Sequence, residues 1–181
     1  PRVTSTYKGY AGYQTNTEFW RYGEAVETVA RQYLELRYRL HPYLYSLAGE
    51  ASQSGVPIMR PFVFDFPQDA DALAEKHSYM FGRALHVAPV VAGGADQWPV
   101  YLPRTPGGWT DLWTGQRREG GRRHEVTTPI EQLPLHGRAG AILPMGPVMQ
   151  STAQTTRLTR IAVPSSLPAA WMASAVSITA S

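Results

Sequence analysis

The segment 55–67, with the sequence GVPIMRPFVFDFP, is short and heavily apolar, begins at a Gly-Val-Pro turn and ends at Pro67. If residues 58–66 are extended, apolar side chains alternate onto both faces of the strand. A strand that is covered on both faces is typical of a parallel sheet or a barrel. We therefore expect 58–66 to be the last strand of an α/β unit.

Two amphipathic helices are predicted before this strand. The first begins near Thr17, a suitable N-cap residue, and carries apolar side chains at helical spacing. It is expected to stop at His41, because the residue before a proline is disfavoured in the α region, and Pro42 then suits the start of the second helix. Gly55 is expected to end that helix. His41 could act as a catalytic base, but a histidine bonded to backbone at a helix junction is the favoured interpretation.

After residue 67 the sequence changes to a rhythm of short segments and turn signals. A short helix is expected to run to about Phe81 and to end at Gly82. Strands are predicted at 85–91, 99–102, 109–113 (followed by a turn at 114–115), around Leu135 and at 141–143. Short strands at close intervals indicate a β-sandwich-like module. Trp109 and Trp113 are expected on one face, where they could stack on sugar rings, although a place in the sandwich core is favoured.

Composition argues against several classes of function. The 181 residues carry a net charge of +3, contain no cysteine and include no apolar run that approaches membrane-spanning length. The arginine pairs 117–118 and 122–123 flank two glycines and are expected on the two arms of one hairpin. A solvated hairpin tip is favoured over an anion or nucleic-acid patch. We therefore expect neither a nucleic-acid partner nor a membrane partner.

A series of sequence blocks identifies a family. In chain order they are EFWRYG (18–23), YLELRYRLHPYLYSLAGEA (33–51), GVPIMRPFVFDFP (55–67), YMFGRALHVAPVV (79–91), VYLP (100–103), WTDLWTG (109–115) and GRAGAILPMGP (137–147). These blocks resemble those of glycoside hydrolase family 31, the α-glucosidase and α-xylosidase family, and follow the family's order. Each block alone is a weak signal, whereas the ordered series is a strong one.

The resemblance implies that the chain holds the end of a (β/α)8 catalytic barrel and the β-sandwich that follows it. The expected fold class is α/β followed by all-β, with the barrel portion at 1–82, the proximal C-terminal β-sandwich at 83–150 and an irregular tail at 151–181. Members of the family hydrolyse α-linked glycosides with retention, using one aspartate as nucleophile and one as acid/base. No block here matches either aspartate motif. We therefore expect both aspartates to lie upstream of this chain, and the isolated chain to be inactive.

The implied substrate is an α-linked oligosaccharide or glycoside, and neither a cofactor nor a metal is expected. Thr4 is a candidate substrate-binding residue, because it stands where the family's Arg-x-His-Gly motif has its histidine. Asp65 is the second candidate, since it lies near the end of the expected strand, where barrel active sites are built. It could orient a sugar hydroxyl or instead pair with Arg60. A non-catalytic carbohydrate- or partner-binding module is the alternative function.

The tail differs in composition from the rest of the chain. Residues 158–163 fit a strand of the family, after which the resemblance stops. The Trp-Met-Ala triplet at 171–173 must be encoded by TGGATGGC plus one base, which read two bases later gives Asp-Gly, the pair in the family's next turn. Residues 164–181 carry no charge, unlike an ordinary sandwich edge. The sequence therefore predicts a frameshift near 163–168.

Overall fold

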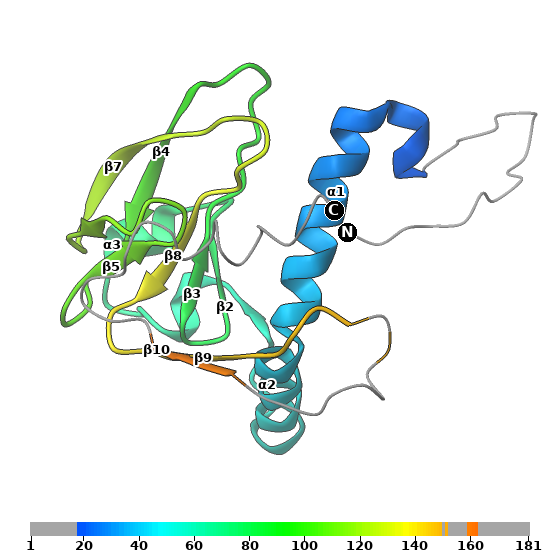
Figure 1. The fold of residues 1–181 in the computed structure, drawn as a ribbon. Coiled ribbons are helices and arrows are strands. Elements are labelled where there is room, and N and C mark those ends of the chain that lie inside the picture. The colour runs from blue at the N-terminus through cyan, green and yellow to red at the C-terminus, as the bar shows by residue number, and fades with distance from the viewer. Residues whose placement is uncertain (1–17, 150, 152–158, 163–181) are drawn as a thin grey trace, which may run out of the picture.

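The protein was analysed as a computed structural model, which describes residues 18–149, 151 and 159–162 (Figure 1). The helical elements are η1 (Phe19–Tyr22), α1 (Glu24–Arg39), α2 (His41–Ser54), η2 (Phe62–Phe64) and α3 (Ala70–Ala74), where η denotes a 3-10 helix. The strands are β1 (Met59–Arg60), β2 (Tyr79–Phe81), β3 (Leu85–Val87), β4 (Gln97–Leu102), β5 (Trp109–Asp111), β6 (Arg117–Arg118), β7 (Arg122–Thr127), β8 (Leu135–Arg138), β9 (Ile142–Met145) and β10 (Thr159–Ala162). Among the described residues, no helix is long and apolar enough to span a membrane.

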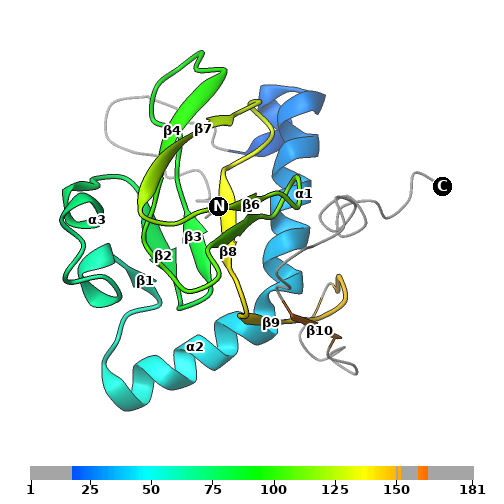
Figure 2. The same cartoon turned by 90° about the vertical axis from the view of Figure 1, so that its left-hand side faces the viewer.

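Antiparallel sheets form the centre of the molecule. The largest has six strands in the order β1-β2-β3-β8-β5-β6, while β4 pairs with β7 and β9 pairs with β10. Figure 1 shows α1 and α2 on one side of the strands, with β4 and β7 on the other, and Figure 2 shows that α2 turns away from the direction of α1. The view at right angles, in Figure 2, shows β4 and β7 as one paired ribbon beside α3.

Two hydrophobic clusters cover the two faces of the six-stranded sheet. The first joins α1, α2, β3, β8 and β9 and includes Leu36, Leu47, Leu85 and Leu143. The second joins η2, α3, β2, β4, β5 and β7. Trp109 of β5 is fully buried in this second cluster. Helices packed on one face and a second sheet packed on the other confirm the expected α/β part followed by a β-sandwich.

The helices agree well with the sequence-based expectation. Pro42 lies in the first turn of α2, and Gly55 ends that helix with a left-handed φ of 74°. The start of the first helix differs, because Gly23, with φ of 92°, separates η1 from α1. The expected cap Thr17 lies outside the described residues.

The expected buried strand at 58–66 is wrong. Only Met59–Arg60 forms a strand, and it pairs antiparallel with β2 at the edge of the sheet rather than between parallel strands. Pro61 follows at once, and a proline has no N–H to donate to a ladder, so the chain turns into η2. Phe62 is buried whereas Phe64 is about half exposed, which matches a turn of helix and not a strand covered on both sides.

Three further expectations are corrected. The helix expected to reach Phe81 ends at Ala74, and Tyr79–Phe81 is strand β2. The arginine pairs do not form one hairpin, because β6 pairs with β5 and β7 pairs with β4. Strand β5 ends at Asp111, so Trp113 leaves the face of Trp109 and packs against the first hydrophobic cluster. Strand pairing decides the first two results, because β2 joins β1 and β3, and β7 joins β4 and not β6.

Strands β1 and β2 lie before the expected domain boundary at 82/83, yet they hydrogen-bond into the same sheet as β3. The division of the chain into domains stays a prediction. In the tail, the strand expected at 158–163 is confirmed as Thr159–Ala162, which pairs with β9. The predicted frameshift near 163–168 lies outside the described residues.

The β2–β3 turn gives a first test of the fold. Gly82 has φ of 62°, and a Cβ built on it would lie 2.3 Å from Tyr43 Oη and 2.6 Å from Leu47 Cδ2. Gly94 has a similar φ of 72° but nothing within 4 Å, so it is the matched control. Alanine in the left-handed region costs about 1–2 kcal/mol. Crowding at a packed site adds a further 1–3 kcal/mol, roughly.

We therefore expect Gly82→Ala to lower the free energy of unfolding clearly more than Gly94→Ala does. Denaturant unfolding of the full chain measures both variants. Equal losses would mean that Gly82 is needed for its backbone conformation alone and that α2 does not pack closely on this turn.

Candidate functional site

Asp65 is the one expected site residue that the structure describes, because Thr4 lies outside the described residues. Asp65 follows η2, and its side chain is 13% exposed. Its Oδ1 lies 3.9 Å from Arg60 Nη1, whereas its Oδ2 is buried without a hydrogen-bond partner among the described residues. The pairing with Arg60, which was the alternative role expected for Asp65, is therefore present.

Arg60 holds the centre of a charged network between α2 and the sheet. Its side chain is only 2% exposed, and it donates from Nε to the Pro57 carbonyl and from Nη2 to Glu50 Oε2 at 3.3 Å. Arg83 donates from Nη2 and Nε to the other oxygen of Glu50, at 2.8 and 3.1 Å. Burial alone would raise the pKa of Glu50, but the Arg83 hydrogen bonds and the Arg60 charge lower it overall. Glu50 is thus held ionised between two arginines.

Arg138 approaches the same region from β8. Its guanidinium lies over the rings of Phe66 and Trp109, with centroid distances of 5.1 and 5.7 Å. Its Nε and Nη2 are buried without a partner among the described residues. Burial lowers the pKa of Arg138, while the negative charge of Asp65 acts in the opposite direction. Asp65 therefore lies in the field of two arginines.

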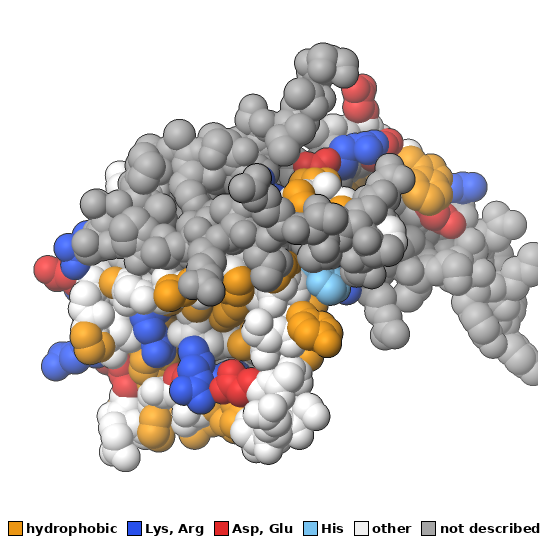
Figure 3. All heavy atoms as spheres, turned by 60° about the horizontal axis from the view of Figure 1, so that its bottom comes forward, with side chains coloured by type: hydrophobic (Ala, Val, Ile, Leu, Met, Phe, Trp, Pro, Cys, Tyr) orange, Lys and Arg blue, Asp and Glu red, His pale blue; other side chains and the backbone are white. Residues whose placement is uncertain are grey.

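A cavity of about 470 Å³ opens beside this network. Its polar lining comes from Tyr43, Ser46 and Glu50 of α2, from Arg83 and from Arg138, and Asp65 is not part of its wall. Figure 3 brings this side of the molecule forward and shows basic and acidic side chains side by side among hydrophobic ones. Glu50, the one carboxylate among the described residues of the lining, is already bound by arginines, so it is a poor proton donor or nucleophile.

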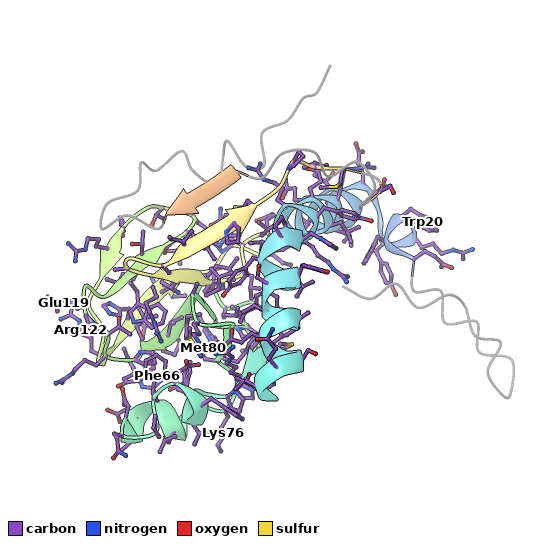
Figure 4. All side chains as sticks on the ribbon, turned by 90° about the horizontal axis from the view of Figure 1, so that it is seen from below. Trp20, Phe66, Lys76, Met80, Glu119 and Arg122 are labelled. Atoms are coloured by element: carbon purple, nitrogen blue, oxygen red, sulfur yellow. The ribbon has the colours of Figure 1, made fainter. Side chains whose placement is uncertain are left out.

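The other sequence candidates have structural places. Trp109 is fully buried and donates its indole N–H to the Pro103 carbonyl at 2.7 Å, and Trp113 donates to the Leu133 carbonyl at 2.6 Å. The favoured core interpretation is therefore confirmed for Trp109, whereas Trp113 is partly buried and packs on the helix side of the sheet, against Tyr33. Figure 4 shows Phe66 and Met80 within the interior, with Trp20, Lys76, Glu119 and Arg122 at the periphery. Among the described residues, no group of three His, Asp or Glu side chains could hold a metal ion.

Two sequence profiles match the chain. The profile of the glycosyl hydrolases family 31 TIM-barrel domain matches residues 6–47, and that of the glycosyl hydrolase family 31 C-terminal domain matches residues 55–143. The two matches follow one another in the order found here, helices first and sheets second. Together they account for well over half of the chain.

Similar proteins agree with these matches. The chain is 34% identical over 135 residues to an α-glucosidase 2 from Bacillus thermoamyloliquefaciens, covering 75% of this chain and 17% of that protein. It is 40% identical over 128 residues to an α-xylosidase from Saccharolobus solfataricus, covering 71% of this chain and again 17% of the relative. A solved family 31 dextranase from Flavobacterium johnsoniae, in complex with glucose, superposes with a TM-score of 0.78 at 34% identity, covering 82% of this chain and 18% of the dextranase.

Fold, profiles and relatives together define a chain that joins the end of a family 31 TIM-barrel domain to the family's C-terminal domain. The chain belongs to glycosyl hydrolase family 31. It spans less than a fifth of the length of these relatives.

The arginine network gives a second test. Arg60→Met removes the buried cation and leaves Glu50 and Asp65 without it, which we expect to cost about 3–5 kcal/mol of unfolding free energy, as for other broken buried pairs. Arg83 binds the same Glu50 but is 69% exposed. Arg83→Met should therefore cost no more than about 1 kcal/mol.

Urea unfolding of both variants at neutral pH measures the difference. If both substitutions lowered the free energy of unfolding by a similar small amount, the buried Arg60 pair would contribute no more to stability than an exposed pair does.

Proposed function

We propose that this chain is the end of the barrel and the C-terminal domain of a retaining α-glycoside hydrolase of the α-glucosidase or α-xylosidase type, acting on an α-linked oligosaccharide or glycoside. The observation that carries the proposal is the consecutive match of both family 31 profiles on one structure, together with relatives that are α-glucosidases and α-xylosidases. The solved dextranase, which holds glucose, supports a carbohydrate substrate.

The contribution of the chain is to fix the last barrel helix onto the domain behind the barrel. Tyr43 of α2 donates a hydrogen bond to the Phe81 carbonyl at 2.8 Å and accepts one from the Ala84 N–H at 3.2 Å. Glu50, one residue before the last turn of α2, accepts from Arg60 and Arg83. A catalytic barrel needs its elements held within fractions of an ångström, and these contacts supply such support.

Retention requires two carboxyl groups about 5–5.5 Å apart across the scissile bond. Glu50 and Asp65 are held by arginines, and an acid/base must instead exchange a proton near the working pH. We therefore assign neither catalytic role to this chain, and propose that the nucleophile and the acid/base come from sequence before it. For this chain we propose a division into the C-terminal portion of the barrel at 1–82, the proximal β-sandwich at 83–150 and an irregular tail at 151–181.

A chimera tests this proposal. Residues 18–149 would replace the corresponding segment of the Saccharolobus α-xylosidase, which is 40% identical. We expect the chimera to hydrolyse p-nitrophenyl α-xyloside at a rate within roughly tenfold of the parent, because the catalytic carboxylates remain in place. The isolated chain serves as the control and should release no p-nitrophenol above a buffer blank.

A folded chimera without turnover would contradict the proposed role. Binding of isomaltotriose by the isolated chain, together with an inactive chimera, would instead support the non-catalytic carbohydrate-binding module.

Asp65 can be tested in the same chimera. Because its carboxylate lies 3.9 Å from Arg60 Nη1 and interacts with the charge of Arg138, we expect Asp65→Ala to reduce turnover modestly, by roughly tenfold or less, through the positions of these two arginines. Measuring kcat and KM for the chimera with and without the substitution checks this. A loss of many thousand-fold in kcat would place Asp65 among the reacting groups.

A further inference from the structure

The two halves of the six-stranded sheet meet where β3 pairs with β8, and we call this pairing the β3–β8 seam. On one side of the seam lie β1, β2 and β3, and on the other lie β8, β5 and β6. The seam has only three registered pairs, and the middle one joins His86 to His136. The two strands are about fifty residues apart in the chain, and within the six-stranded sheet theirs is the pairing that joins the two halves.

Both histidines are completely buried, with no exposed side-chain surface. Their ring centroids are 5.6 Å apart. The ring of His86 stacks on Phe62 at 5.4 Å and meets the edge of Trp109 at 5.7 Å. All four ring nitrogens lack a hydrogen-bond partner within the described part of the chain. A positive charge on either ring would therefore have no acceptor here, which is costly in an apolar site.

The surroundings of the pair do not offer a free anion. Asp111 of β5 is opposite His136, but its Oδ1 accepts from two backbone N–H groups and its Oδ2 lies 3.5 Å from Arg118. The other charged groups near His136 are cations or potential cations, Arg118 and His124.

The remaining neighbours add no free carboxylate either. From β2 the facing residue is Met80, and β4 and β7 contribute apolar side chains to this cluster. Arg138, two residues after His136 on β8, adds another cation, and Asp65 lies beside Arg60. Burial is the main cause that lowers the pKa of both histidines, to about 3 for His136, with the neighbouring cations adding to it.

We propose that the β3–β8 seam is an acid-sensitive latch, which holds the two halves of the sheet together only while His86 and His136 are neutral. In the unfolded chain both rings take up protons as the pH falls through about 6.5, whereas in the folded chain they do not. The stability that the latch provides is therefore complete above pH 6.5 and is lost progressively below it. Each histidine makes the unfolding equilibrium constant rise about tenfold per pH unit, so the pair gives about a hundredfold.

Chemical denaturation of the full chain between pH 6.5 and 5.0 tests the latch, above the range where most carboxylates titrate. The wild-type unfolding constant should rise about a hundredfold per pH unit below 6, and His86→Leu or His136→Leu should reduce this to about tenfold. His77 is exposed, so His77→Gln is the matched control and should keep the wild-type slope. A flat wild-type profile, or an equal effect of His77→Gln, would overturn the proposal.

A measurement on the wild-type chain covers the case in which a leucine variant does not fold. Ring C–H signals of the five histidines can be followed by NMR during acid titration. We expect two of them to stay at the neutral position until the protein unfolds, with amide exchange in β3 and β8 increasing as unfolding begins. Titration of all five near pH 6.5 in the folded protein would overturn the latch.

Discussion

The hydroxyl of Tyr43 joins the helical part of this chain to its sheets, and the other contacts between them depend on that junction. The hydroxyl donates to one end of the β2–β3 turn and accepts from the other, which places α2 directly against the turn. Gly82 lies between those two bonds, and the space of its missing Cβ is filled by Tyr43 and Leu47. Burial raises the pKa of Tyr43, so the hydroxyl keeps its proton and remains a donor. With α2 fixed in this way, Glu50 reaches the arginines of β1 and of the turn.

The parts of the fold that could be predicted from sequence are those set by local backbone chemistry. Pro42 and Gly55 delimit α2 because one fixes φ and the other allows a left-handed cap. The prediction of a strand at 58–66 was wrong for the opposite reason, because strand formation there depends on pairing and not on local backbone chemistry. Its apolar pattern was compatible with a strand, but its partner β2 lies about twenty residues later and leaves β1 at the edge of the sheet, and Pro61 prevents the ladder from continuing. Periodicity reports burial and says nothing about which strands meet.

Even less of the candidate site than of the fold could be predicted from the sequence. Asp65 was found from its position, yet its environment is made by Arg60 and Arg138, which are five and more than seventy residues away. The arginine in an otherwise apolar stretch was the one local signal, because a buried guanidinium requires acceptors. Which acceptors it found could not be read from spacing. The family resemblance supplied the order of the elements, and only the structure shows that α2 provides the anion.

The buried polar groups on one face of the sheet also have a consequence for its register. Across the strands β1, β2, β3, β8 and β5, the paired residues are Arg60, Met80, His86, His136 and Asp111. Replacing such a row by apolar side chains would often be neutral or stabilising, since buried polar groups seldom add stability. A slip of the register by one residue, however, would turn every member of the row to the other face of the sheet. There they would meet the apolar side chains of the first hydrophobic cluster. Strands of two to four residues have few ladder bonds to resist such a slip. The polar row therefore fixes the register at some cost in stability, and in His86 and His136 that cost becomes dependent on pH.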